Sequence, residues 1–142
     1  MSLDRPDKLT WLEKVPLFRS CEGELVEHIA DASGELDFAD GQAIVQQGQV
    51  GNGLYIVVSG AVRIVAGGVE LARLGPGDFF GELSVIDQQP RNATVFAVGQ
   101  TVCLALASWD LIALLERDTR LAMNLLRELA GRLRRADAQL RN

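Results

Sequence analysis

The stretch FFGELSVIDQQPRNATV, from Phe79 to Val95, decides how the rest of the chain is interpreted. It contains an acid, Glu82, and an arginine, Arg91, nine positions further on, and both of its flanks are apolar. A charged side chain that leaves water destabilises the fold unless a partner compensates the lost hydration. The two charges therefore either pair with each other or are kept for a ligand.

The residue types around the two charges favour a ligand that carries an anion and a hydroxyl group. Gly81 allows an unusual backbone angle or a close approach of a ligand. The residues ELSVI can form one helical turn, whose first N–H groups are free to bind an anion. The Arg91 guanidinium suits two oxygens of a phosphate, whereas Glu82 can only accept and so suits a hydroxyl. This combination describes a nucleotide phosphate joined to a ribose.

Residues 35–107 read as short apolar or alternating strands separated by turns. Three breaks share glycine and turn-forming neighbours: Ser59-Gly60, Gly75-Pro76-Gly77 and Gly99-Gln100. The first and third predict two-residue hairpins, and the second suits a type II turn. Strands at roughly ten-residue spacing with such turns indicate an antiparallel barrel or jelly roll. The opening stretch then lies between two barrel strands, as a loop and short helix before a strand that begins near Thr94.

Helical periodicity marks both ends of the chain, in residues 8–34 and 108–142. The first zone includes a helix that begins near residues 22–24 and closes at Gly34. Ser108 is the predicted N-cap of a helix in the second zone, and a longer helix follows from about Thr119. Leu121 and Leu125 share a face of this longer helix and are predicted to pack inward.

A second apolar stripe follows another face of the C-terminal helix. Its members are spaced alternately four and three residues apart, as in a coiled-coil seam: Ala122, Leu126, Leu129, Leu133, Ala136 and Leu140. A single helix that lies on the barrel needs only one stripe. Two stripes favour a partner helix, such as that of a homodimer, or a contact that moves.

Length and composition exclude several classes of protein. At 142 residues, 48% of them hydrophobic and 23% charged, the chain predicts one domain over residues 1–142. It has neither an apolar run of about 18 residues nor a leader, so we expect a cytoplasmic protein without membrane insertion. Cys21 and Cys103 are expected to be reduced thiols. With His28 as the single histidine, the chain lacks a zinc, iron–sulfur or Ser/His/Asp set, so we predict no metal and no catalytic residue.

The charge of the chain argues against direct binding of nucleic acid. The net charge is −5 and the isoelectric point is about 4.8, which is the wrong sign for a polyanionic partner. Residues 127–141 are locally basic, and this is explained by a solvated helix face whose cations suit the helix dipole.

The stretch FGELSVIDQQPRNATV resembles the phosphate-binding cassette of the cyclic-nucleotide-binding domain family. The likeness extends to GLYIVVSGAVRI and LGPGDFFGE and to the helices on both sides, so it covers nearly the whole chain. This family includes bacterial catabolite activator protein, regulatory subunits of cAMP-dependent protein kinase and cyclic-nucleotide-gated channels. The resemblance implies a mainly β fold, an antiparallel β jelly roll (double-stranded β-helix) at residues 35–107 with its cassette at 79–95. N-terminal helices at 8–34 and a long C-terminal helix within 108–142 would flank it.

The resemblance also implies a regulatory module that binds cAMP, or cGMP, as a ligand and uses no cofactor. By matching position, Arg91 would bind the cyclic phosphate and Glu82 the ribose 2′-hydroxyl. The long C-terminal helix would close over the base and transmit binding. The other implied contacts are Gly81, Leu83, Ser84 and Ala93 around the phosphate, and Ile64, Val65 and Arg132 beside the base.

One residue departs from the family pattern, and two alternative functions stay open. Ser, Thr or Ala commonly follows the cassette arginine, and Thr often accompanies a preference for cGMP, but here the residue is Asn92. The choice between adenine and guanine is therefore open. The chain could be the sensor half of a catabolite-activator-like transcription regulator. It could instead be a domain in which Glu82 pairs with Arg91 and which acts only in dimerisation or protein interaction.

Overall fold

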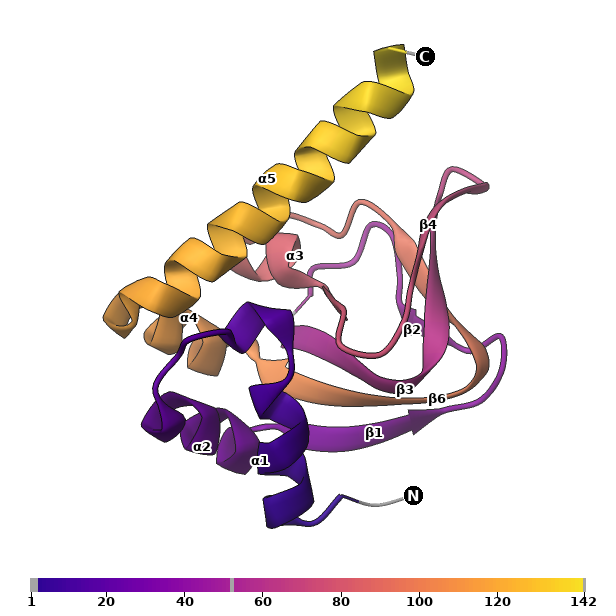
Figure 1. Ribbon diagram of the computed structural model, residues 1–142. Coiled ribbons are helices and arrows are strands. Elements are labelled where there is room, and N and C mark those ends of the chain that lie inside the picture. The colour runs from indigo at the N-terminus through magenta and orange to yellow at the C-terminus, as the bar shows by residue number, and fades with distance from the viewer. Residues whose placement is uncertain (1–2, 52, 142) are drawn as a thin grey trace.

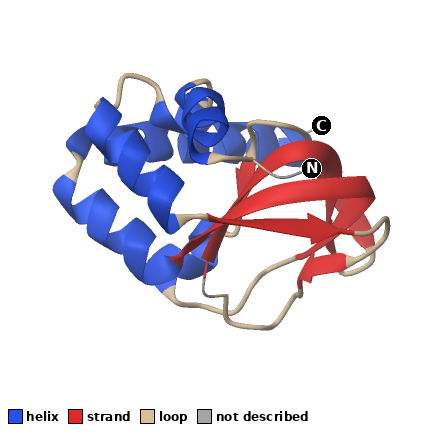
Figure 2. Cartoon of the chain, turned by 90° about the horizontal axis from the view of Figure 1, so that it is seen from below, coloured by secondary structure: helices blue, strands red, loops and turns tan. Residues whose placement is uncertain are grey.

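Helices gather on one side of a barrel of strands (Figure 1 and Figure 2). The computed structural model describes residues 3–51 and 53–141, without the side chains at 83, 84 and 139–141. The helices are α1 (Arg5–Glu13), the 3-10 helix η1 (Pro16–Phe18), α2 (Gly23–Ala32), α3 (Glu82–Asp87), α4 (Ser108–Arg117) and α5 (Thr119–Arg141). The strands are β1 (Gly34–Phe38), β2 (Ala43–Val45), β3 (Gly53–Ala66), β4 (Val69–Leu74), β5 (Phe79–Phe80) and β6 (Thr94–Ala107).

The strands pair antiparallel in the order β1-β6-β3-β4, while β2 joins β6 and β5 joins β3. The two long strands β3 and β6 pair with each other along most of their length and form the spine of the barrel. This architecture is the predicted jelly roll with N-terminal helices and a long C-terminal helix. As predicted, the cassette is a loop and short helix, α3, between two strands.

Two predicted hairpins are wrong, because Ser59-Gly60 and Gly99-Gln100 lie inside continuous strands. Gly60 in β3 and Gly99 in β6 have φ angles of +81° and +71°. The pairing register shifts on both sides of Ser59, as at a β-bulge. A Cβ at Gly60 would lie 2.5 Å from the carbonyl oxygen of Gln100, so glycine lets the two strands bend while they stay paired.

The turn between β4 and β5 forms as predicted, whereas the predicted cap of α4 does not. Asp78 N donates to Gly75 O at 3.1 Å, and Gly77 between them has a φ angle of +90°. Ser108 is the first helical residue of α4, and Ala107 occupies the N-cap position without a side-chain hydrogen bond. Because β6 runs directly into α4, no loop residue is left to act as a cap.

Alternate residues of the long strands divide the core into two apolar clusters. In β3, Leu54, Ile56 and Val58 pack toward the helices, whereas Val57 and Val62 pack inside the barrel. The helix-facing cluster also takes side chains from α1, η1, α2, α4 and α5. Helices from both ends of the chain are therefore fixed to the same face of the sheet.

Helix α5 begins as a core helix and ends beyond the rest of the chain (Figure 1). Leu121 and Leu125 are buried, as predicted, with exposed fractions of 0% and 5%. Of the second stripe, Leu126 and Leu133 are 58% and 70% exposed, while Leu129 packs against the helix-facing cluster. The stripe is thus only partly free for a partner, and the side chain of Leu140, its last member, lies outside the described residues.

Within the described residues, no helix is both long and apolar enough to cross a membrane. In the same part of the chain, no group of three or more His, Cys, Asp or Glu side chains is placed to hold a metal ion. Both cysteines are free thiols; Cys103 is buried and Cys21 is half-buried.

Candidate functional site

The backbone of Arg91 is fixed by the loop that precedes β3. Arg91 N donates to Gln49 O, and Gly48 N donates to Arg91 O, each at 2.8 Å. Next to this pair, Val50 bridges to Pro90 in antiparallel fashion. These bonds hold the end of the cassette against residues 48–50, so the arginine projects from a constrained position.

The Arg91 side chain is buried among backbone carbonyl groups. It is 8% exposed, and its Nη1 and Nη2 donate to Gly81 O and Gly53 O, both at 3.2 Å. Within the described residues, no carboxylate oxygen lies within 4.0 Å of this guanidinium. Burial lowers the pKa of Arg91 from its ordinary value, while Tyr55 and Glu82 raise it. The guanidinium therefore keeps a desolvated charge that two neutral acceptors compensate only in part.

Glycine is required at two backbone positions that touch the guanidinium. A Cβ at Gly51 would overlap the guanidinium of Arg91, and a Cβ at Gly81 would lie 2.8 Å from its Nη1. Gly81 also has a φ angle of +95°, a conformation that other residues rarely adopt. Glycine at these two positions thus leaves the space that the Arg91 guanidinium occupies.

Glu82 is bound by an arginine from the other end of the chain. It is the first residue of α3 and 4% exposed, and its Oε1 accepts from Arg132 Nη1 at 3.1 Å. Arg132 Nη2 donates to Phe79 O at 2.7 Å, and its guanidinium carbon lies 4.3 Å from the centre of the Phe79 ring. Through these contacts α5 is attached to the cassette.

Burial and the neighbouring charges have opposite effects on the pKa of Glu82. Burial raises the pKa of the Glu82 carboxyl above its ordinary value, whereas the guanidinium groups of Arg132 and Arg91 lower it. The Arg132 side chain is 25% exposed and that of Glu82 is 5% exposed, so solvent screens the pair from the arginine side only. Burial is the larger effect, so the pKa of Glu82 is raised, and the ion pair with Arg132 limits this rise.

The two cassette charges do not pair with each other. Among the described residues, the ion pair of Glu82 is with Arg132, and the acceptors of Arg91 are backbone carbonyls. The arrangement therefore differs from the internal pair that the sequence left open.

Four other predicted residues are divided between the barrel and the surface. Ile64 packs against the cluster inside the barrel, and Ala93 is buried near the end of the cassette. Val65 is half-buried and follows a register shift that separates it from Ile64. Asn92 is exposed.

Leu83 and Ser84 directly follow Glu82, so their backbone lies at the start of α3. Their side chains lie outside the described residues. The structure thus brings the cassette residues and Arg132 together at one end of the barrel.

Sequence reasoning missed three residues of the site. These are Gly51, Gly53 and Phe79, which contact the two arginines. The two glycines are visible as GNG immediately before an apolar strand, and this is a signal for close backbone approach. Nothing in the local sequence of Phe79 indicates that it lies under an arginine from α5.

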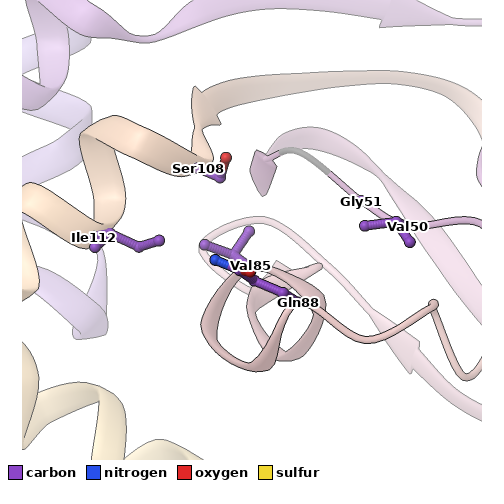
Figure 3. Close-up of a pocket in the computed structure, with 6 residues that line it drawn as sticks. All are labelled: Val50, Gly51, Val85, Gln88, Ser108 and Ile112. Carbon is purple, nitrogen blue, oxygen red and sulfur yellow. The ribbon is translucent and has the colours of Figure 1, made fainter.

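A separate pocket of about 290 Å³ lies between α3, the start of α4 and the loop before β3 (Figure 3). Its lining residues are Val50, Gly51, Val85, Gln88, Ser108 and Ile112. Because Gly51 also touches Arg91, the pocket borders the cassette, but neither of the two cassette charges lines it.

Fold and site together describe a jelly-roll domain whose cassette holds a buried acid and a buried arginine. The profile of the cyclic nucleotide-binding domain matches residues 35–118, which is more than half of the chain. The chain belongs to the cyclic nucleotide-binding domain family. Members of this family are regulatory, not catalytic, domains, and the resemblance stated from the cassette sequence is confirmed.

Two relatives show which kinds of regulator the chain is related to. It is 42% identical over 130 residues to the cyclic AMP receptor protein of Thermus thermophilus, with coverage of 88% of this chain and 60% of the relative. It is 36% identical over 104 residues to the cAMP-dependent protein kinase regulatory subunit of Dictyostelium discoideum, with coverage of 68% and 32%. The chain therefore corresponds to three fifths or less of the length of these relatives.

Solved structures share the fold over most of the chain. The crystal structure of Thermus thermophilus catabolite activator protein has a TM-score of 0.78 and 42% identity, and covers 88% of this chain and 61% of that one. The regulatory domain of Toxoplasma gondii PKA, co-crystallised with cAMP, has a TM-score of 0.77 and 30% identity, with coverage of 90% and 50%. Both similarities support the jelly-roll assignment.

Proposed function

We propose that the chain is a receptor module for a cyclic nucleotide, cAMP or cGMP, which regulates a partner and catalyses no reaction itself. The observation that carries the proposal is the buried Arg91 guanidinium, whose described acceptors are the carbonyls of Gly53 and Gly81. A desolvated cation gains stability from an anion, and the guanidinium fork matches two phosphate oxygens. Membership of the family supports the same assignment.

The cyclic phosphate is assigned to Arg91. Binding would exchange contacts to neutral carbonyls for charge-assisted hydrogen bonds, which are roughly twice as strong. Gly51 and Gly81 admit the guanidinium to this position because neither carries a side chain. The backbone N–H groups of Leu83, Ser84 and Ala93 are the proposed remainder of the phosphate cradle.

The ribose 2′-hydroxyl is assigned to Glu82. An ionised carboxylate has about four acceptor sites, so Glu82 can bind a hydroxyl while it also accepts from Arg132. Burial raises the pKa of Glu82 and Arg132 lowers it, so the contact with Arg132 favours the ionised form, which only accepts hydrogen bonds. Glu82 and Arg91 lie on the same short cassette. This suits a ligand in which the ribose and the phosphate are covalently linked.

The base is assigned to the apolar strand beside the cassette. Ile64 and Val65 are the proposed wall, and Arg132, already held over Phe79, is the proposed contact from α5. The Asn92 side chain is exposed, and it is the candidate residue for the choice between adenine and guanine. We take cAMP as the first ligand to test because both relatives above are named for it.

The transmission of ligand binding to a partner is assigned to α5. Its Arg132 contacts Glu82, so a ligand that engages Glu82 acts on an existing contact of the helix. Such a ligand can change the free-energy difference between two positions of the helix only by as much as its binding free energy differs between them.

Helices from both ends of the chain share one apolar cluster with the barrel, so the chain is proposed to form a single domain.

The second candidate is the sensor half of a transcription regulator, supported by the Thermus relative, of which the chain covers 60%. Here α5 would be a dimer interface, since Leu126 and Leu133 are exposed seven residues apart. Sedimentation equilibrium tests this: the native chain is expected to dimerise and Leu133→Glu to stay monomeric. A native chain that remains monomeric at high concentration would remove the dimer.

Calorimetric titration tests the proposed function itself. The ligands are cAMP, cGMP and 2′,3′-cyclic AMP, which has the same atoms as cAMP but no free 2′-hydroxyl. We expect one site that binds cAMP or cGMP and that prefers either of them to the 2′,3′ isomer. Absence of binding for both 3′,5′-cyclic nucleotides would overturn the proposal.

A further inference from the structure

The two carbonyl groups that bind Arg91 come from two different strands. Gly53 is the first residue of β3, and Gly81 directly follows β5. The two positions are close together, since a Cβ at Gly81 would lie 2.9 Å from Gly53 O. The guanidinium of Arg91 donates to both carbonyls, so its place depends on how β5 lies against β3.

Strand β5 is two residues long and is attached to β3 at both of its ends. At its start, Val57 N donates to Asp78 O at 2.9 Å. At its end, Phe80 pairs with Tyr55, and the two rings are stacked with their centres 5.2 Å apart and their planes 8° apart. Because Phe80 directly precedes Gly81, this ring pair stands next to the carbonyls that bind the arginine.

The two rings belong to the apolar cluster inside the barrel. Phe80 is 3% exposed, and Tyr55 is half-buried and packs against the same cluster. Aromatic pairs gain stability beyond the burial of their area, and they prefer defined separations of their ring centres. The Tyr55 ring also lies near Arg91: burial lowers the pKa of the guanidinium, and of the two groups that raise it Tyr55 has a larger effect than Glu82. The stack is thus placed to fix the two strands beside the arginine.

We propose that Tyr55 is a positioning residue for Arg91, and that it acts through its ring stack on Phe80. The stack fixes the two strand ends that carry the carbonyls of Gly53 and Gly81, and these carbonyls hold the guanidinium in place before a ligand arrives. A group that is already in place needs no ordering when the ligand binds, so binding is tighter. The part of this inference that concerns the phosphate rests on the proposed function.

Substitutions of Tyr55 separate the effect of its ring from that of its hydroxyl. Tyr55→Phe keeps the ring and removes only the hydroxyl, whereas Tyr55→Leu removes the ring and keeps an apolar side chain. Phe38→Leu is the matched control, because it removes a ring from the same cluster but lies in β1, which pairs with β6. Circular dichroism checks that each variant is folded. Tyr55→Met, with a flexible side chain that fills irregular space, takes the place of Tyr55→Leu if that variant does not fold.

NMR of the arginine side chains in the full chain tests the positioning without nucleotide. The Nη hydrogens of Arg91 are hydrogen-bonded and buried, so they should exchange with water at least about tenfold more slowly than those of the exposed Arg120. Arg91→Lys identifies the Arg91 signals by their loss. Tyr55→Leu is expected to speed this exchange by about fivefold or more, while Tyr55→Phe and Phe38→Leu leave it unchanged. Unchanged exchange in a folded Tyr55→Leu, or equal acceleration in either of the other two variants, would overturn the proposal.

The two phosphorothioate diastereomers of cAMP test the consequence for the ligand. In each of them, sulfur replaces one of the two exocyclic oxygens of the phosphate. A guanidinium in a fixed place should distinguish the two oxygens, so calorimetry of the native chain should give affinities that differ at least about fivefold. In Tyr55→Leu this ratio should move toward one, and cAMP itself should bind about fivefold more weakly or more. The ratio should keep its native value in Tyr55→Phe and Phe38→Leu.

The ratio of the two affinities separates positioning from stability, because a barrel that is only less stable would lower both affinities together. A native ratio near one, or a native ratio that persists in Tyr55→Leu, would refute Tyr55 as the positioning residue. If the native chain binds no cyclic nucleotide, the proposed function fails. The exchange of the Arg91 hydrogens then still decides whether the ring stack holds the arginine.

Discussion

Glu82 pairs with Arg132, fifty residues further along the chain, at an Oε1–Nη1 distance of 3.1 Å. Arg91, which is close to Glu82 in sequence, is bound by the carbonyls of Gly53 and Gly81 instead. The acid of the cassette is thus tied to α5, and the arginine is tied to backbone. A ligand that engages both would reach an existing contact of α5 at the acid.

Removal of the 2′-hydroxyl from the ligand is expected to weaken binding through Glu82. A hydrogen bond to a charged group contributes about 1.5–3 kcal/mol, so 2′-deoxy-cAMP should bind the native chain roughly tenfold or more weakly than cAMP. Glu82→Ala should bind both ligands about equally. Calorimetry of the four combinations gives the coupling energy, and equal binding of both ligands to the native chain would remove the role of Glu82.

Gly51→Ala is expected to displace the guanidinium of Arg91, because the added Cβ would overlap it. We expect cAMP affinity to fall about tenfold or more as the arginine leaves its position between the carbonyls. Gly34→Ala in β1 is the control, since a Cβ there meets nothing within 4 Å. Equal affinity of Gly51→Ala and the native chain would show that the arginine does not need this space.

Glu82→Gln is expected to change how stability depends on pH. The pKa of Glu82 is raised in the folded chain from 4.5, so the folded state binds more protons than the unfolded state above that pH. The contribution of native Glu82 to stability is therefore greatest below the ordinary pKa and falls as pH rises through the raised one. Between about pH 4 and pH 7, the Tm of Glu82→Gln should rise relative to that of the native chain.

Arg132→Gln gives the opposite control for this pH dependence. Loss of the cation that lowers the pKa of Glu82 should enlarge the fall in stability with rising pH. A Tm difference between Glu82→Gln and the native chain that stays constant from acid to neutral pH would contradict the burial argument.

The two faces of α5 should respond differently to truncation. Leu121 is completely buried, so Leu121→Ala should lower the free energy of unfolding by about 2–5 kcal/mol. Leu133 is 70% exposed, so Leu133→Ala should change it by less than about 0.5 kcal/mol in the monomer. Denaturant unfolding at low protein concentration measures both, and a similar loss for the two variants would contradict the assigned faces.

The sequence was sufficient for the architecture because the cassette and the alternating strands are local signals. The short helix α3, the turn around Pro76 and the inward face of Leu121 and Leu125 all follow from residues close together in the chain. The hairpins at Gly60 and Gly99 were wrong for a related reason. A glycine with positive φ can end a strand or bend it, and only pairing between β3 and β6 decides which.

The contacts of the site depended on non-local packing. Nothing near Arg91 in sequence indicates that Gly51 and Gly53 would form its surroundings, because they reach it through the loop before β3. Arg132 was expected beside a base, and the structure holds it on Glu82 and Phe79. Such pairs become visible only once α5 is placed against the barrel.

The cAMP affinity of the native chain, Arg91→Ala and Arg120→Ala, measured by calorimetry, tests the central claim most directly. Arg120→Ala is the control, because it removes the same charge from an exposed position on α5. Removal of one partner from a desolvated charge pair weakens binding by roughly 2–5 kcal/mol, so Arg91→Ala should bind at least about thirtyfold more weakly. Arg120→Ala should stay within about twofold of the native affinity, because exposed charges contribute little. A folded Arg91→Ala that binds cAMP as tightly as the native chain would contradict the assignment of the phosphate to this arginine.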